Sequence, residues 1–279
     1  MKKLKISIII RTCGRPQILR NALQSIRKQT YGNIEVIVIE DGDNLSENLV
    51  QTEFSDLDIV YRYTGEKKGR CYVGNLGLRI AQGDYFNFLD DDDILLENHV
   101  EILVNKILEK KCEVVYAIAE EHQIIVKNKG QHVFDVKRKL IRYKQPFNKL
   151  LLCYLNYLPI QCVMFSRALY EKFGGFDEKL NLLEDWDLWV RYAMACYFEF
   201  IPEVTSIYYT PYKDKKKKIR DVSLRRAERE VLEKLKSYEM CVSVRDVNQE
   251  MGYILNVFAK KGIWFYLQKI KNYLLYKDL

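Results

Sequence analysis

The sequence predicts an α/β protein whose core is a mostly parallel β-sheet flanked by helices, followed by a C-terminal helical extension. Three observations predict this class. Short aliphatic runs alternate with segments of helical periodicity through the first half of the chain, as in βαβ units. These runs are largely continuous in apolar residues, which is typical of strands covered on both faces. Carboxylates directly follow several of the runs, and ligands of open α/β sheets bind at the carboxyl ends of the strands.

The first half of the chain supplies most of the expected sheet. Residues 6–10 form the first strand, and Pro16 suits the first turn of the helix that follows. Apolar residues from Ile18 to Ile26 recur on one face of that helix. Further strands are expected at residues 35–39, 59–63, 84–89 and 114–119, and helices at residues 15–29, 73–81 and 97–110.

Beyond residue 120 the pattern is less regular. The expected elements are a hairpin of residues 124–126 and 132–136, a strand at 163–165, a helix at 167–173 closed by Gly174 and Gly175, a helix at 186–196, and strands at 198–201 and 205–209 around Pro202. We therefore expect a sheet domain over residues 1–210 and a basic, mainly helical extension over residues 211–279.

The composition excludes several classes of protein. The chain has 279 residues, 48% hydrophobic and 30% charged, which is the balance of an ordinary globular protein. Its seven cysteines form no CxxC pair and its three histidines lack metal-ligand spacing, which argues against a disulfide framework and a zinc hydrolase. The N-terminal apolar run is too short for a signal peptide, and no run approaches the ~20 apolar residues of a membrane span. We therefore expect a cytoplasmic location.

Three acidic groups are expected at the ligand-binding edge of the sheet: Asp41, the four aspartates at residues 90–93, and Glu184 with Asp185. Mg²⁺ and Mn²⁺ prefer oxygen ligands and bridge carboxylates to phosphate, so this arrangement suits a polyphosphate ligand. Two carboxylates ~4 Å apart repel by about 4 kcal/mol at an effective dielectric constant near 20, and a bound cation offsets that repulsion. Alternatively, the third or fourth aspartate of the run caps the next helix, and the two roles are compatible.

Five segments carry a resemblance to a known family in their order and spacing. They are ISIIIRTCGRP, LQSIRKQTYGNIEVIVIEDGD, GNLGLRIAQGDYFNFLDDDD, VMFSRALYEKFGGFDEKL and EDWDLWVRYA. The span from Lys5 to about Tyr209 resembles family 2 glycosyltransferases of the GT-A fold, a Rossmann-like sheet flanked by helices. The resemblance implies a catalytic domain at residues 1–210 that moves a sugar from a nucleoside-diphosphate sugar to an acceptor hydroxyl, with inversion.

The resemblance implies that the nucleoside is held after the first two strands. The matching residues are Thr12 and Asp41, with Glu40 beside Asp41. Family members often carry an aromatic residue directly after the Thr, where it can stack on the base, but this chain has Cys13 there. This departure bears on the identity of the nucleotide rather than on the reaction class.

A second departure lies at the start of the helix expected at residues 73–81. The family's frequent Ala-Arg-Asn is replaced by Val73, Gly74 and Asn75. Asn75 stays among the expected nucleotide-sugar contacts, and Arg11 or Arg70 is expected to replace the missing arginine.

The resemblance also implies a metal site and a base. The DxD motif, which serves the ribose and the metal–diphosphate group, maps onto Asp90 and Asp92, with Asp91 between them. Mn²⁺ or Mg²⁺ is therefore expected on Asp92 and Asp90. The late acidic motif maps the catalytic base onto Asp185, preceded by Glu184. Without the resemblance, we favour a charge pair at a helix N-terminus for these two residues, which the helix dipole stabilises.

Three aromatic residues and a leucine lie on the helix expected after the late acidic motif. Trp186, Leu188, Trp189 and Tyr192 suit either the hydrophobic core or a sugar-binding platform, and we favour the core.

The basic C-terminal region leaves alternatives open. Residues 213–220 are either a solvated loop or a segment that closes over a diphosphate. Residues 263–277, IWFYLQKIKNYLLYK, suit an interfacial helix or a helix packed on the main domain or a dimer partner. The interfacial interpretation predicts peripheral contact with the inner face of the cell membrane, next to a glycan or lipid-linked acceptor. Nucleic acid is not an expected partner, because the lysine block lacks interleaved aromatic residues.

The resemblance, together with a cysteine pattern typical of a reducing cytoplasm, implies a role in cell-surface polysaccharide or lipid-linked glycan biosynthesis. One alternative is a scaffold subunit that binds a nucleotide sugar but has lost catalysis, although intact Asp90, Asp92 and Asp185 argue against it. A nucleotidyltransferase is a weaker alternative, because such enzymes usually have a glycine-rich loop after the first strand and ISIIIRTCGRP has one glycine.

Overall fold

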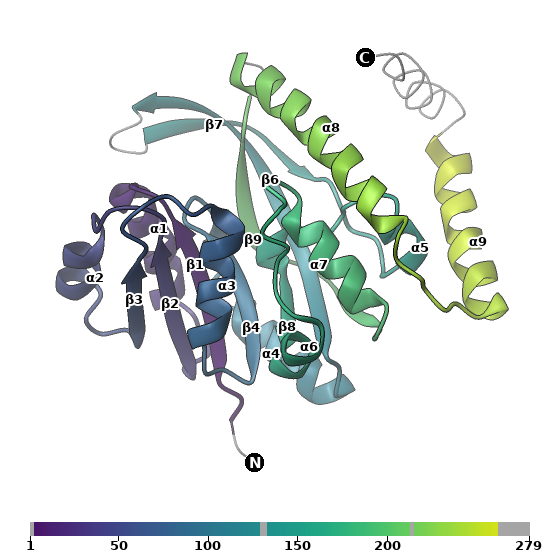
Figure 1. Cartoon of the computed structure of the whole chain (residues 1–279), viewed down its shortest axis with the longest axis horizontal. Helices are drawn as coiled ribbons and strands as arrows, with labels where there is room; N and C mark the ends of the chain where they lie inside the picture. Colours follow the sequence, from purple (N-terminus) through teal and green to yellow (C-terminus); the bar gives the residue numbers. More distant parts are fainter. Residues whose placement is uncertain (1–2, 129–132, 213–214, 262–279) are drawn as a thin grey trace.

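The computed structural model describes residues 3–128, 133–212 and 215–261, which form a mixed sheet with helices on both faces (Figure 1). The strands are β1 (Ile6–Thr12), β2 (Ile34–Glu40), β3 (Ile59–Tyr63), β4 (Tyr85–Asp90), β5 (Ile94–Leu95), β6 (Val114–Asn128), β7 (Val133–Ile141), β8 (Val163–Ser166) and β9 (Phe198–Pro211). The helices are α1 (Pro16–Arg27), α2 (Glu47–Glu53), α3 (Arg70–Ile80), α4 (His99–Lys110), α5 (Lys149–Leu152), the 3₁₀ helix η1 (Ile160–Cys162), α6 (Arg167–Phe173), α7 (Glu184–Ala193), α8 (Lys215–Leu235) and α9 (Val244–Lys261). The predicted α/β class is confirmed.

Neighbouring strands follow the order β3-β2-β1-β4-β8-β6-β9-β5, and β7 pairs with β6. The first four strands in this order are parallel, because a helix returns the chain between each strand and the next. The register pairs Thr12 with Glu40 and Arg11 with Asp90. The carboxyl ends of β1, β2 and β4 are therefore level, and the residues that follow them gather at one edge of the sheet.

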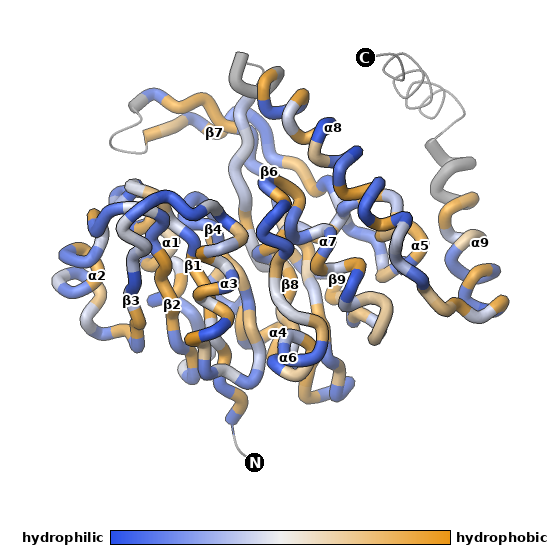
Figure 2. Tube along the Cα trace, viewed as in Figure 1, coloured by the Kyte–Doolittle hydropathy of each residue, from blue (hydrophilic) through white to orange (hydrophobic). Residues whose placement is uncertain are grey.

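Two hydrophobic clusters cover the two faces of the parallel strands. Because side chains alternate along a strand, Ile8 and Ile10 face one cluster and Ile9 faces the other. Helices α1, α2 and α4 complete the first cluster, with Leu23 and Leu103 fully buried, and α3 and α7 contribute to the second. Figure 2 shows hydrophobic residues concentrated along β1 and β2. Each fully buried Leu or Ile contributes roughly 1.5–3 kcal/mol, so both faces hold the edge of the sheet in place.

The break predicted at Pro202 is wrong, because residues 198–201 and 205–209 belong to the single strand β9. Pro202 lies in a bulge, where residues 201–203 lie opposite Ala117 of β6. Proline is tolerated in a bulge because its missing N–H is not needed by the ladder of hydrogen bonds.

The predicted hairpin is confirmed as the antiparallel pair of β6 and β7, although the turn at residues 129–132 lies outside the described residues. Strand β6 also contains the strand predicted at residues 114–119, so one 15-residue strand runs from the sheet into the hairpin. In Figure 1 this hairpin extends beyond the body of the protein. Helices α2, α5 and η1 have no counterpart among the predicted elements.

The described region after β9 is mainly helical, with α8 beginning at Lys215 and α9 at Val244. The loop interpretation of residues 213–220 is wrong from Lys215 onward, because these residues form the first turns of α8. Helix α9 packs on α5, where Glu250 accepts a hydrogen bond from the backbone N–H of Leu150 at 2.6 Å. Within the described ranges, no helix is both long and apolar enough to cross a membrane. The tail helix predicted at residues 263–277 lies outside the described residues.

Candidate active site

A cavity of about 830 Å³ opens at the carboxyl ends of the parallel strands, within the range of roughly 300–1,000 Å³ typical of ligand sites. Its walls come from β1, the start of α3, β4, η1, the start of α7, β9 and the first half of α8. The predicted site residues that line it are Arg11, Thr12, Asp41, Arg70, Asp90, Asp92, Glu184 and Asp185. The structure thus brings together acidic motifs that lie far apart in the sequence.

Arg11 joins two of these motifs. Its Nε and Nη2 donate hydrogen bonds to Oδ1 of Asp90 at 3.0 and 2.6 Å, and its Nη1 donates to Oε1 of Glu184 at 2.6 Å. The guanidinium lies over the rings of Phe88 and Phe176, so the charge is almost fully buried. Burial alone would raise the pKa of Asp90, but the charges of Arg11, Arg70 and Arg15 and the hydrogen bonds from Arg11 together outweigh burial and lower that pKa. The Asp90 carboxylate therefore stays ionised.

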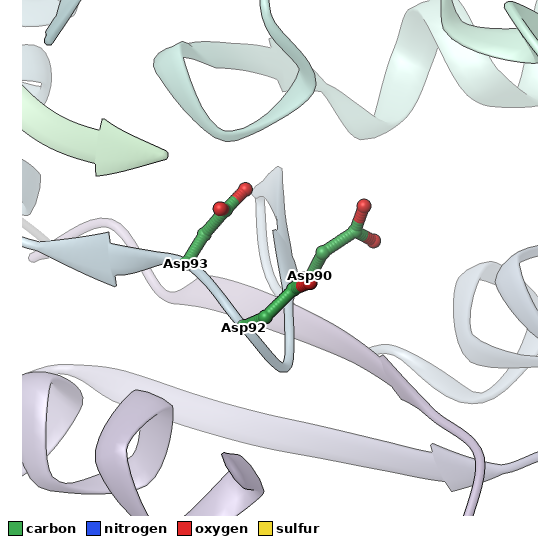
Figure 3. A group of neighbouring side chains, drawn as sticks. All are labelled: Asp90, Asp92 and Asp93. Atoms are coloured by element: carbon green, nitrogen blue, oxygen red, sulfur yellow. The ribbon is translucent and has the colours of Figure 1, made fainter. Parts of the chain in front are cut away.

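The turn between β4 and β5 gathers three carboxylates, from Asp90, Asp92 and Asp93 (Figure 3). One oxygen from each lies within 4.8 Å of the others, and the backbone N–H of Asp93 closes the turn on the carbonyl of Asp90 at 3.0 Å. Burial, together with the neighbouring carboxylates, raises the pKa of Asp93 well above its usual value. Three carboxylate oxygens at this spacing are the donor set that Mg²⁺ or Mn²⁺ prefers.

The capping alternative for this aspartate run is wrong. The next helix, α4, has Asn98 at its N-cap, and β5 lies between the run and that helix.

Asp91 lies outside the cavity lining, because its fully buried side chain is turned to the loop after β1. It accepts hydrogen bonds from Oγ1 of Thr12 at 2.7 Å and from Nε of Arg15 at 3.0 Å, and Nη2 of Arg15 completes a bidentate pair. Burial raises the pKa of Asp91 to about 7 against the opposing effect of Arg15. Asp91 therefore positions Thr12 at the cavity and has no direct access to it.

Glu40 and Asp41 are adjacent in the sequence, but one side chain stabilises loops and the other lines the cavity. Glu40 is fully buried and bonds the loops on both sides of it, accepting from the backbone N–H groups of Gly14 at 3.1 Å and Ser46 at 2.9 Å. Asp41 lines the cavity and accepts from the backbone N–H groups of residues 68 and 69 at 2.6 and 3.1 Å. Of the two, Asp41 is the residue that a ligand can reach.

Asn75 does not line the cavity. Its Nδ2 donates to the carbonyl of Phe176 at 3.0 Å and to the side chain of Glu178 at 2.9 Å, and its Oδ1 accepts from the N–H of Phe176 at 2.8 Å. Asn75 therefore holds the loop after α6. Arg70, at the start of the same helix α3, lines the cavity with its Nη1 at 3.7 Å from Glu184.

Asp185 lies in the first turn of α7 and faces the cavity. Its Oδ1 accepts hydrogen bonds from Nδ2 of Asn156 at 3.2 Å and from the N–H of Trp186 at 2.9 Å. Burial, and then the charge of Glu184, raise the pKa of Asp185 to about 7. A carboxyl group with such a pKa is suited to accept a proton near neutral pH. Both Glu184 and Asp185 also lie in the first turn of α7, where the helix dipole stabilises negative charge. The interpretation as a catalytic base and the interpretation as a helix-terminal charge pair are therefore compatible.

The core interpretation of the three aromatic residues and the leucine after Asp185 is confirmed. Trp186, Leu188, Trp189 and Tyr192 are all at most 1% exposed. Both indoles donate hydrogen bonds to backbone carbonyls, that of Trp186 to Leu152 at 2.6 Å.

The sequence analysis did not single out three residues that the structure places at the site. Asp93 belongs to the acidic run, and its place as the third carboxylate depends on the turn between β4 and β5. Arg15 could have been identified from the sequence, because it is a basic residue in the loop after the first strand. Asn156 lies in an irregular segment with no local pattern that marks it.

Comparisons with known proteins point to one family. The sequence model of glycosyl transferase family 2 matches residues 7–174. An uncharacterized glycosyltransferase of Rickettsia typhi (strain ATCC VR-144 / Wilmington) is 30% identical over 203 residues, which are 71% of this chain and 62% of the relative. The putative colanic acid biosynthesis glycosyl transferase WcaA of Escherichia coli (strain K12) is 29% identical over 189 residues, 67% of this chain and 65% of the relative. The match therefore spans less than two thirds of the length of either relative.

A solved structure shares the fold. The mannosyltransferase PcManGT from Pyrobaculum calidifontis, in complex with GDP-Man and Mn²⁺, superposes with a TM-score of 0.58 at 16% sequence identity, covering 96% of this chain and 85% of that chain. This likeness concerns the fold alone and agrees with the predicted GT-A architecture.

Proposed function

The chain belongs to glycosyl transferase family 2, and on that premise we propose that it moves a sugar from a nucleoside-diphosphate sugar to an acceptor hydroxyl, with inversion and with the help of Mn²⁺ or Mg²⁺. The observation that carries the proposal is the Arg11 bridge between Asp90 and Glu184. Through this bridge, the carboxylates suited to a cation and the carboxyl group suited to a base line the same cavity.

The proposed step is a single in-line displacement. The acceptor oxygen bonds to the anomeric carbon while the bond from that carbon to the diphosphate breaks, and the hydroxyl proton passes to Asp185. The hydrogen bonds from Asn156 and Trp186 both go to Oδ1 of Asp185, which leaves Oδ2 to take the proton. General-base catalysis of this kind contributes typically ~10²–10⁴-fold to the rate.

The donor would lie along the ends of the parallel strands. Asp41 and Thr12 are placed to contact the nucleoside, with Glu40 and Asp91 holding their loops in place. A divalent cation held by the carboxylates of residues 90, 92 and 93 would supply positive charge to the departing diphosphate. The GDP-Man and Mn²⁺ bound by PcManGT support this assignment by analogy of fold.

The proposed pathway is the synthesis of a cell-surface polysaccharide or a lipid-linked glycan, which the name of the E. coli relative supports. The acceptor would then be a glycan or a lipid-linked glycan at the inner face of the membrane. The nucleotidyltransferase alternative gains no support from the comparisons.

The test combines binding and turnover. Thermal unfolding is followed with UDP-GlcNAc, UDP-Glc and GDP-Man, each with and without Mn²⁺, and nucleoside diphosphate release is measured with a membrane lipid extract as the acceptor source. We expect metal-dependent stabilisation by one nucleotide class, because a ligand at ~100 times its Kd adds about 2.7 kcal/mol. Asp92→Asn should lose this stabilisation, and Asp185→Asn should keep it but release no product.

The matched control is Asp56→Asn, which removes an exposed carboxylate paired with Arg27 away from the cavity. It should behave as the wild-type protein in both assays. Normal turnover in Asp185→Asn would refute the base assignment, and nucleotide binding without turnover in the wild-type protein would favour the scaffold alternative.

A further inference from the structure

Helix α8 is anchored to the body of the protein by its second half. Val231 is fully buried, and Nζ of Lys234 lies 2.7 Å from carboxylate oxygens of both Asp177 and Asp187. Just beyond the helix, the hydroxyl of Tyr238 donates to Asp187 at 2.8 Å. Asp187 belongs to α7, the helix whose first turn carries Asp185. The anchor of α8 is therefore tied to the same helix as the proposed base.

The first half of α8 borders the cavity instead. Arg220, Ser223 and Leu224 line it, at the spacing of i, i+3 and i+4 that defines one helical face. Ile219 and Val222 are 67% and 60% exposed and do not line the cavity. The first half of α8 thus turns one face to the cavity, and that face carries the guanidinium of Arg220.

Charge distinguishes Arg220 from the other basic residues of the cavity. Arg11 is paired with Asp90 and Glu184, Arg15 with Asp91, and Arg70 lies 3.7 Å from Glu184. Arg220 has no carboxylate partner within the part of the chain that the structure describes. Arg11 and Arg15 are largely neutralised by their carboxylate partners, so an anionic ligand gains little from them. Arg70 only shares Glu184 with Arg11, so Arg70 and Arg220 supply the charge that an anionic ligand can use.

From these contacts we propose that Arg220 binds a phosphate oxygen of the donor's nucleoside diphosphate, which makes α8 part of the donor site. The proposal rests on the proposed function, since it assumes a nucleoside-diphosphate donor in this cavity. A guanidinium suits this task because its planar fork can bind phosphate through two hydrogen bonds and stays charged at any physiological pH. Its exposure at the cavity mouth allows it to meet the diphosphate as the donor enters.

The test is calorimetric titration of UDP, GDP, CDP and dTDP into the full chain with Mn²⁺ present. Arg220→Ala should weaken the binding of the preferred diphosphate by about tenfold, which is typical of losing a hydrogen-bonded charge. Arg220→Lys should recover part of the affinity, and Arg220→Glu should bind more weakly than Arg220→Ala. The matching free nucleoside should bind all variants alike, because it carries no phosphate.

The control is Arg226→Ala on the same helix. Arg226 has a side chain that is 84% exposed, pairs with Glu230 and does not line the cavity, so its removal should leave diphosphate affinity unchanged. Equal melting temperatures for all variants without ligand would show that each one folds.

The outcomes separate this inference from the proposed function. If wild-type protein binds no nucleoside diphosphate, the proposed function fails and this inference fails with it. If wild-type protein binds one and Arg220→Ala binds it equally well, only the role of Arg220 is overturned. In that second case, a higher KM for the lipid-extract acceptor in Arg220→Ala would assign the residue to a phosphate on the acceptor.

Discussion

The walls of the cavity are built in two different ways. The charged wall, formed by β1, β4 and the start of α7, is held by the buried pairs of Arg11 with Asp90 and Glu184. The mixed wall, formed by η1, β9 and α8, includes Pro159, Ile160, Tyr208, Tyr209, Arg220 and Leu224. A buried ion pair resists movement because separation leaves unpaired charges, whereas apolar side chains adapt at lower cost. We infer that the charged wall sets the chemistry, whereas the mixed wall, which includes Arg220, adapts to the bound substrates.

The largest change in the free energy of unfolding should follow from removing the Arg11 guanidinium, which pairs with both carboxylates of the charged wall. Arg11→Met leaves Asp90 and the buried Glu184 without their partner, and loss of one member of a buried pair costs about 3–5 kcal/mol. The free energy of unfolding from urea titration measures this loss. Arg20→Met, which breaks a surface pair with Glu53, should cost much less, and an equal loss in both variants would show that Arg11 does not hold this wall.

A smaller loss should follow from weakening the anchor of α8. Buried Asp187 bonds to Arg191, Lys234 and Tyr238, so Asp187→Asn should cost about 1–3 kcal/mol through imperfectly satisfied partners. Amide hydrogen exchange should speed up in α8 while β1 and β4 stay protected. The exposed control Glu233→Gln should leave exchange unchanged, and uniform acceleration in Asp187→Asn would mean that α8 is not a separate unit.

The pH dependence of turnover tests the environment of Asp185. Because its pKa is raised to about 7, kcat/KM should rise with pH through that region as the carboxyl group loses its proton. The charge of Glu184 helps to raise this pKa, so Glu184→Gln should move the rise to lower pH. A rise that stays in place, or moves to higher pH, would contradict the assignment of Asp185 as the titrating base.

The smallest effect should come from replacing Asn156, and it should shift the pH dependence of kcat/KM in the direction opposite to Glu184→Gln. Its hydrogen bond lowers the pKa of Asp185, so Asn156→Ala should move the rise in kcat/KM to higher pH. Loss of one hydrogen bond to an ionised carboxylate is worth about 1.5 kcal/mol, which predicts a rate reduced roughly tenfold. Binding of the nucleoside diphosphate should be unchanged, and weaker binding would instead place Asn156 in the donor site.

Much of the fold followed from local patterns. The continuous aliphatic run at residues 6–10 predicts a strand buried on both faces, and every residue of β1 is buried. Pro202 shows the limit of such patterns, because a bulge can accommodate a proline that otherwise signals a break. The short helices α2, α5 and η1 lacked periodicity long enough to identify them.

What the sequence by itself determined is the class of fold and the position of the acidic motifs, because strand and helix periodicities are local and parallel strands end at a common edge. Only the tertiary structure decided the direction of each side chain. Asp91 turns inward to Arg15 while Asp93 joins the cavity, and Asn75 bonds a loop that lies a hundred residues further along the chain. The pairing of Arg11 with Glu184 is equally remote in sequence. Packing and burial determine such partners. A buried charge is strongly destabilising unless an opposite charge lies beside it, and the fold decides which residue that is.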